Sequence, residues 1–277
     1  MKFLCTGDLH IGFRRKLDPE KTIKYFSGIF EDIYTLVCVE DIDALIFTGD
    51  IFDDNEVDSR LFQILVNFIN KIRKVKIFIA PGNHDPYTSD SPYQNYEWPE
   101  NVHVFKGWES IEVSDCIIHG YGYLEKAPDI DALLQLDRTK FNTQKTNIVV
   151  IHGIVKELQT KEKDKRPALE FSTNDIINIG ADLVLLGHIH NPRTLYQTDK
   201  ILAAYSGEPI NRYQRELVSR GVIVGEISGK MIDLKLRSLK CPQEYKIFSR
   251  RGRDYSKQQE SYEPVYHNEL KWDMLRN

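Results

Sequence analysis

The first 80 residues alternate between short apolar runs and longer segments of helical periodicity, and this alternation restricts the fold more than any other feature. Apolar runs at 2–6, 44–48 and 75–80 predict buried strands. Pro19 after Asp18 marks a helix start between the first two. Apolar residues then recur at helical spacing in two segments: Ile23, Phe26, Phe30, Ile33 and Val37, then Leu61, Leu65, Phe68 and Ile72. Strands separated by helices predict a parallel sheet with helices on its faces, an α/β fold.

The rest of the chain has a stronger β character. We expect short strands at 102–105, 110–113, 117–121, 147–151 and 183–186, followed by a β-meander over 193–238. Two polar stretches, 156–166 and the tail from Cys241 onward, are expected to be exposed loops. The pattern therefore predicts a main domain over 1–240 and a C-terminal extension over 241–277.

Charge and composition argue against several classes of protein. The 277 residues include 37 basic and 41 acidic side chains, and this balance argues against a protein that coats nucleic acid along its whole surface. No apolar run approaches the ~20 residues of a membrane span, and the N-terminal apolar stretch is too short for a signal-peptide core. The four cysteines lie far apart. We therefore expect a cytoplasmic protein with free thiols and no membrane partner.

Most of the histidines follow predicted strands. Five of the eight stand in short loops rich in Gly, Asp or Asn, and they are His10, His84, His152, His188 and His190. Ligands bind at the ends of strands in open parallel sheets. Together with Asp8, Asp50 and Asn83, this placement favours a metal site over five separate structural histidines. The remaining three, His103, His119 and His267, lack such a context and are expected to be structural or surface residues.

The spacing and the mixture of side chains indicate the kind of metal. Asp8 and His10, like His188 and His190, are two residues apart, so both members of each pair lie on one side of an extended segment. Carboxylate, amide and imidazole ligands suit Mn, Fe, Zn or Co better than Ca or Mg. Seven ligands are too many for one transition metal, and they suit two ions that share a carboxylate, about 3.5–4 Å apart.

The five loops, DLH, GDIFD, GNHD, His152 and GHIH, occur in order from residue 8 to residue 190 and resemble the calcineurin-like metallophosphoesterase superfamily. The resemblance implies a two-sheet β-sandwich flanked by helices, with a dimetal centre at the strand ends. It also implies the metal ligands: Asp8, His10, Asp50 and His190 for one ion, and Asp50, Asn83, His152 and His188 for the other, so that Asp50 bridges the two.

A closer resemblance is to the Mre11/SbcD group of DNA-repair nucleases, carried by DLHIG, GDIFD, GNHD with the segment 91–105, and YSGEP at 205–209. Archaeal and eukaryotic members carry histidine where bacterial SbcD-like members, like this chain, carry aspartate, here Asp53. We expect Asp53 to accept a hydrogen bond rather than to bind metal.

The resemblance further implies manganese, DNA as substrate, a coiled-coil ATPase partner of the SbcC/Rad50 type, and a homodimer. The short segment after Cys241 leaves little room for a capping domain, which favours single-stranded or flexible DNA as substrate.

The ligand set also predicts a mechanism. A hydroxide shared by two metals is a nucleophile at neutral pH. In the similar nucleases the histidine at the position of His84 acts on the leaving group or orients the phosphate, and Asp85 is expected to hold its imidazole. Three basic residues that follow the first metal loop are candidates for binding flanking phosphates, with a solvated loop as the equal alternative: Arg14, Arg15 and Lys16.

Three functions are compatible with these sequence features. The first is a dimetal phosphodiesterase that acts on DNA as an exonuclease or endonuclease. The second is a small-molecule phosphoesterase for a cyclic nucleotide or a phosphomonoester, because fold and metal site do not fix the substrate. The third is a non-catalytic scaffold, which ranks last because every ligand position of the superfamily is intact in this chain.

Overall fold

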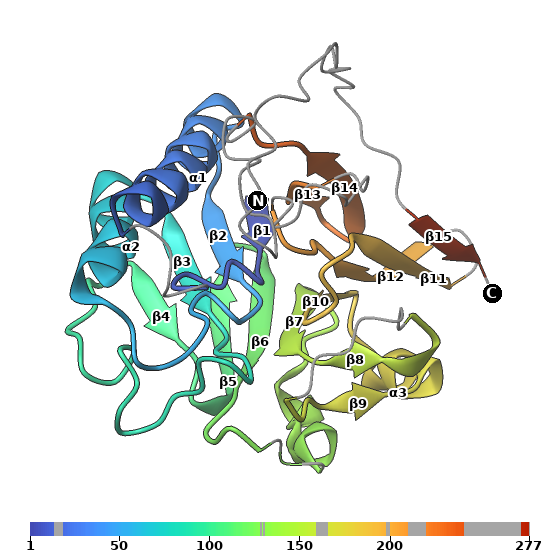
Figure 1. The fold of residues 1–277 in the computed structure, drawn as a ribbon. Coiled ribbons are helices and arrows are strands. Elements are labelled where there is room, and N and C mark those ends of the chain that lie inside the picture. Colours follow the sequence, from blue (N-terminus) through green and yellow to red (C-terminus); the bar gives the residue numbers. More distant parts are fainter. Residues whose placement is uncertain are drawn as a thin grey trace, which may run out of the picture.

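The computed structural model describes residues 1–13, 19–127, 129, 131–158, 166–197, 200–209, 220–240 and 273–276. Two mixed β-sheets pack face to face, and α-helices lie on their outer faces (Figure 1). This is the two-sheet α/β architecture that the sequence predicts.

The first sheet has the strand order β14-β13-β1-β2-β3-β4. Its strands are β1 (Lys2–Thr6), β2 (Ala44–Phe47), β3 (Lys76–Ile79), β4 (Val102–Val104), β13 (Val222–Ser228) and β14 (Met231–Arg237). The strands β1 to β4 run parallel, which confirms the pattern predicted from the alternation of strands and helices. The antiparallel hairpin β13–β14 extends the sheet beside β1.

Two helices connect the first parallel strands, α1 (Pro19–Val39) and α2 (Ser59–Lys71). Asp58 caps the start of α2, because its side chain accepts a hydrogen bond from the backbone of the first turn. The apolar stripes of both helices join one core cluster with the outer face of the first sheet. Within it, the rings of Phe30 and Phe68 lie 4.9 Å apart and pack the helices together.

The second sheet has the strand order β15-β11-β12-β10-β7-β6-β5. Its strands are β5 (Gly107–Val113), β6 (Cys116–Gly122), β7 (Thr146–His152), β10 (Leu183–Gly187), β11 (Arg193–Gln197), β12 (Lys200–Tyr205) and β15 (Asp273–Arg276). A third, two-stranded sheet pairs β8 (Ile154–Val155) with β9 (Glu170–Phe171). Three 3-10 helices complete the described elements: Ala132–Gln135, Arg138–Lys140 and Lys156–Leu158.

One helix lies against the outer side of the second sheet, α3 (Thr173–Ile179). It begins at a capping box in which Ser172 and Asp175 exchange side-chain and backbone hydrogen bonds, and it ends at Gly180 with φ 74°. These start and stop signals are visible in the sequence, but the helix was not predicted, because only seven residues separate them.

The predicted meander over 193–238 is wrong in its pairing, although its four strands form. β11 pairs with β12, and β12 pairs with β10, in the second sheet, whereas β13 and β14 belong to the first. Periodicity identifies a strand but not the sheet that it joins. Two predicted loops also contain ordered elements: β15 pairs with β11 within the tail, and Leu158 is buried at the start of 156–166.

The core between the sheets is formed by fully buried side chains from both, among them Phe3 and Ile46 from the first and Ile118, Val150 and Leu185 from the second. Central strands are buried on both faces, because helices cover the other side. This explains why they read as continuous apolar runs. Among the described residues, no helix is both long and apolar enough to traverse a bilayer.

The described cysteines carry free thiols, as expected: Cys5, Cys38 and Cys116. Cys241 lies outside the described residues.

The packing between the sheets makes a prediction about stability. Replacing fully buried Leu185 by alanine opens a cavity between the sheets and should lower the free energy of unfolding by about 2–5 kcal/mol. Urea denaturation measures this. The control is Leu134→Ala on the 84% exposed Leu134, which should change stability by less than about 0.5 kcal/mol. Equal effects would contradict the two-sheet core.

Candidate metal centre

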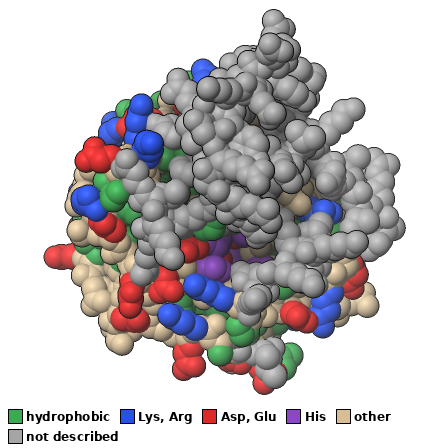
Figure 2. Space-filling model, in the orientation of Figure 1, with side chains coloured by type: hydrophobic (Ala, Val, Ile, Leu, Met, Phe, Trp, Pro, Cys, Tyr) green, Lys and Arg blue, Asp and Glu red, His purple; other side chains and the backbone are tan. Residues whose placement is uncertain are grey.

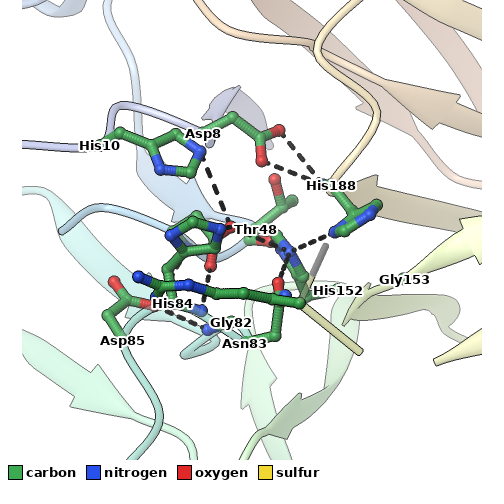
Figure 3. Close-up of polar contacts among 12 residues, drawn as sticks. Asp8, His10, Thr48, Gly82, Asn83, His84, Asp85, His152, Gly153 and His188 are labelled. Carbon is green, nitrogen blue, oxygen red and sulfur yellow. Dashed lines mark hydrogen bonds and ion pairs between the residues drawn. The ribbon is translucent and has the colours of Figure 1, made fainter. Parts of the chain in front are cut away.

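The candidate ligands gather where strands of both large sheets end (Figure 3). Asp8 and His10 follow β1, Asp50 follows β2, Asn83 follows β3, His152 ends β7, and His188 and His190 follow β10. Two groups have ligand atoms within 4.8 Å of one another: Asp8, His10 and His190, then Asp50, His152 and His188. The structure therefore brings the predicted residues together from segments up to 182 positions apart, since 190 − 8 = 182.

Asp50 lies between the two groups. Its Oδ2 is 3.7 Å from Nε2 of His10 in one group and 3.3 Å from Nε2 of His152 in the other. Its Oδ1 accepts a hydrogen bond of 3.0 Å from the backbone of His84. Burial opposes ionisation of this carboxyl, but the neighbouring imidazoles of His152, His84 and His10 hold its pKa well below the usual range. A buried carboxylate thus faces both groups.

The donor atoms around His152 are arranged as a cation would require. Its Nδ1 lies 2.8 Å from the carbonyl oxygen of Thr48, and a carbonyl only accepts, so Nδ1 carries a proton. Its Nε2 faces the Oδ1 of Asn83 at 3.0 Å and the Nδ1 of His188 at 3.3 Å. Burial alone would lower the pKa of His152, but the charge and hydrogen bond of Asp50 raise it above its ordinary value. A divalent cation fits this donor set. It would bind Nε2 and compete there with the second proton of the imidazolium, while Nδ1 keeps its proton.

The backbone of the ligand loops is strained. Six described residues other than glycine have positive φ, and four of these are candidate ligands: Asp8 (53°), His10 (47°), Asp50 (52°) and His188 (97°). Such conformations are costly for residues with a Cβ and persist only where the surroundings enforce them. The strain is concentrated at this site.

Glycines allow the loops to approach one another closely. A Cβ on Gly82 would lie 2.2 Å from Oδ1 of Asp50, and a Cβ on Gly187 would lie 2.1 Å from the carbonyl oxygen of Thr48. Neither contact can be relieved without moving the ligand loop itself. The glycines of the motifs are therefore required by packing as well as by turn geometry.

Asp85 differs from the prediction that it holds the imidazole of His84. Its described hydrogen bonds come from the backbone N–H groups of Asp50, Phe52 and Gly82 and from the hydroxyl of Tyr93 at 2.5 Å. Burial, together with the charge of Asp50, raises the pKa of Asp85 to about 6. Asp85 therefore ties the second and third ligand loops together.

Asp53, rather than Asp85, lies against the imidazoles of His10 and His84. Its Oδ1 lies 3.1 Å from Nδ1 of His10, as expected for a hydrogen-bond acceptor, and its carbonyl oxygen accepts from Nδ1 of His84 at 3.0 Å. Burial opposes ionisation of Asp53, but the hydrogen bond and charge of His10 lower its pKa. His10, Asp53 and His84 also form a third group with ligand atoms within 4.8 Å.

The basic residues near the site were only partly predicted. Arg14, Arg15 and Lys16 lie outside the described residues. Arg166, which sequence analysis assigned to a solvated loop, donates to the carbonyl oxygen of Asp53 at 3.2 Å and lies 3.4 Å from a carboxylate oxygen of Asp54. Histidines are visible in a hollow of the surface, with acidic and basic side chains beside them (Figure 2).

Two tyrosines for which sequence analysis predicted no role support the end of β7 and the residues that follow it. The hydroxyl of Tyr123 donates to the carbonyl of His152 at 3.0 Å and accepts from the backbone of Leu169. Tyr205 makes the equivalent pair of bonds to Gly153 and Val155. Both hydroxyls link the β8–β9 segment to the end of β7, a connection for which no local sequence pattern exists.

The histidines expected to be structural lie outside the centre where they are described. His119 is fully buried on β6, within hydrogen-bond distance of Ser110 and Asn147. His103 lies 3.4 Å from a carboxylate oxygen of Glu109. His267 lies outside the described residues.

Several curated proteins are similar to this chain. The uncharacterized metallophosphoesterase YhaO of Bacillus subtilis is 24% identical over 66% of the chain and 45% of its own length. DNA double-strand break repair protein Mre11 of Sulfolobus acidocaldarius is 22% identical over 83% of the chain. The SbcD component of the nuclease SbcCD of Bacillus subtilis is 23% identical over 76% of it. The chain spans 62% of the length of each of these last two.

The fold also matches a solved structure, GAP50, the anchor in the inner membrane complex of Plasmodium. The TM-score is 0.54 at 14% identity, covering 87% of this chain and 85% of that one. The family model for calcineurin-like phosphoesterases matches residues 1–192, which include every candidate ligand. With its two-sheet fold and its strained Asp/His loops, this chain belongs to the calcineurin-like phosphoesterase family.

Proposed function

We propose that this chain is a dimetal-dependent phosphodiesterase that cleaves DNA, an exonuclease or endonuclease of the SbcD/Mre11 type. The observation that carries the proposal is the position of Asp50, whose Oδ2 faces His10 on one side and His152 on the other. A carboxylate shared in this way is typical of two-metal hydrolases. Relatives named as the repair protein Mre11 and as a component of the nuclease SbcCD support DNA as the substrate.

The proposed ligands are those expected from the resemblance. Asp8, His10, Asp50 and His190 would hold one ion, and Asp50, Asn83, His152 and His188 the other, with manganese first and Fe, Zn or Co as alternatives. When bound, the two ions would lower the pKa of water and neutralise charge on the phosphoryl oxygens.

His84 is the proposed catalytic residue of the chain itself. Its Nδ1 donates to the carbonyl of Asp53, so the ring is fixed with Nε2 on the side of Asp50, 4.0 Å from its Oδ2. From there, His84 would deliver a proton to the leaving oxygen or orient the phosphate. Asp53 would position both His84 and His10, and Asp85 would hold the loops that carry Asp50 and His84.

The proposal extends to substrate and partners. Arg14, Arg15 and Lys16 would bind phosphates beside the scissile one, and Arg166 adds a positive charge next to Asp53. We further propose a catalytic domain over 1–240 with an extension over 241–277, a homodimeric cytoplasmic enzyme, and a coiled-coil ATPase partner of the SbcC/Rad50 type.

One experiment tests the substrate class. The purified chain is assayed with manganese on single-stranded DNA, duplex DNA and a chromogenic phosphodiester in parallel. The proposal expects manganese-dependent cleavage of DNA. Robust turnover of the small ester with no cleavage of either DNA would favour the small-molecule phosphoesterase instead.

The first variant tests the shared carboxylate. Asp50→Asn should abolish hydrolysis and weaken binding of both ions, because the neutral amide no longer offsets the repulsion between them. Metal titration and a DNA cleavage assay measure the two effects. Asp43→Asn makes the same change at the opposite end of β2 and should leave both unchanged. Near wild-type hydrolysis by Asp50→Asn would refute the bridging role.

The second variant tests the leaving-group role of His84. His84→Ala should retain metal and slow DNA cleavage by ~10²–10⁴-fold, because a general acid is lost. A nitrophenyl ester, whose leaving group needs no proton, should be affected less. His103→Ala is the control histidine. Equal losses on both substrates, or loss of metal, would contradict the role.

The third variant tests phosphate contacts. Replacing both Arg14 and Arg15 by alanine should weaken DNA binding and reduce the slope of log affinity against log salt by about one per lost contact. Hydrolysis of a small ester should barely change, because it reaches only the metal site. The exposed pair Arg73 and Lys74, replaced in the same way, controls for net charge. An unchanged salt slope would remove these arginines from the proposal.

A further inference from the structure

Two histidines of the centre, His10 and His152, each have a partner on the outer ring nitrogen Nδ1, whereas His188 turns its Nδ1 toward His152. Nδ1 of His10 lies 3.1 Å from the carboxylate of Asp53, and Nδ1 of His152 donates to the carbonyl of Thr48 at 2.8 Å. Each partner holds the proton on Nδ1 and leaves Nε2 to face the site. Metal-binding histidines generally have such an outer partner, which fixes the tautomer and the direction of the ring.

Glu208 is the acidic residue beside Nδ1 of His190, at a longer distance. Its Oε2 lies 3.9 Å from Nδ1 of His190, and its backbone N–H donates to the carbonyl of His190 at 2.9 Å. Glu208 belongs to the YSGEP segment after β12. Gly207, with φ 69°, permits this approach, because a Cβ there would lie 2.4 Å from the same carbonyl oxygen.

Arg220 fixes the orientation of the Glu208 carboxylate. One guanidinium nitrogen of Arg220 lies 3.0 Å from Oε1 of Glu208, and another donates to the carbonyl of His190. Both side chains are almost fully buried, with 5% and 2% of their surface exposed. Removing two charges from water is costly, and a buried pair adds little net stability over apolar side chains. Arg220 contacts Oε1 of this carboxylate, and Oε2 is the oxygen that faces Nδ1 of His190.

We propose that Glu208, held by Arg220, is a positioning residue that selects the Nδ1–H tautomer of His190 and thereby presents Nε2 to a divalent cation. The inference rests on the proposed ligand role of His190. A separation of 3.9 Å is too long for a direct hydrogen bond, so Glu208 would favour the proton on Nδ1 through the field of its carboxylate or through a bridging water. On this account, the YSGEP segment is part of the metal centre, although it follows the last ligand by 18 positions, since 208 − 190 = 18.

Calorimetric titration with manganese tests the proposal. Glu208→Gln keeps the size of the side chain and removes its charge, so one of the two metal affinities should fall by ~10–100-fold while the other is unchanged. Glu40→Gln is the matched control, because it removes the charge of the remote ion pair with Arg237. A folded Glu208→Gln chain that binds both ions as tightly as the wild type would overturn the proposal.

A spectroscopic measurement on the wild-type chain tests the proposal even if the Glu208→Gln variant does not fold. In metal-free wild-type protein, long-range ¹H–¹⁵N correlation spectra of labelled histidines report which ring nitrogen of His190 carries the proton. We expect Nδ1. A proton on Nε2 alone would overturn the proposal even if Glu208→Gln failed to fold.

His190→Ala separates the failure of this inference from that of the metal assignment. If His190→Ala loses one ion and Glu208→Gln loses none, His190 is a ligand and Glu208 does not position it. If His190→Ala also retains both ions, the proposed ligand role is itself wrong, and the positioning role falls with it. Both comparisons measure metal binding and not DNA cleavage, so their outcome does not depend on the proposed substrate.

Discussion

The hydrogen bond between the imidazole of His152 and the carbonyl of Thr48 links the two halves of this molecule. His152 ends β7 in the second sheet, and Thr48 follows β2 in the first, so the 2.8 Å bond joins both sheets at their strand ends. It also fixes the ring so that Nε2 faces Asp50 and Asn83. The contact requires Gly187, because any side chain there would meet the Thr48 carbonyl. The site therefore depends on close packing of loops from two separate sheets.

A second link of the same kind supports the first. Both carboxylate oxygens of Asp8, after β1, accept from the backbone of His188, after β10, at 3.1 and 3.2 Å. Buried carboxylates are costly unless they are hydrogen-bonded or paired. Asp8, Asp50, Asp85 and Glu208 are each almost fully buried, and each has such partners at the junction of the candidate ligand loops. The buried charge that suits a cation thus also holds the loops in their strained conformations.

The parts of this site that could be predicted are those with a local signature. Apolar runs and helical spacing identified β1 to β3 and their two helices, and the short Asp/His loops identified the side chains that the fold brings together as candidate ligands. Asp85 was misjudged, because adjacency to His84 in sequence says little about where its carboxylate lies. Arg166 and Glu208 reach the site only through the tertiary fold. Arg166 ends a stretch expected to be a solvated loop, and Glu208 belongs to the YSGEP segment, which carried the family resemblance but indicated no role for this carboxylate. The choice of sheet for β11 to β14 depends on long-range pairing, which periodicity does not record.

Anomalous diffraction at the manganese edge, from crystals of the chain soaked with Mn²⁺, tests the central claim most directly. The claim predicts two peaks about 3.5–4 Å apart on opposite sides of the Asp50 carboxylate, one near His10 and His190 and the other near His152 and His188. A single peak would contradict it. So would a peak enclosed by His10, Asp53 and His84, the third group whose side chains lie close enough to hold an ion.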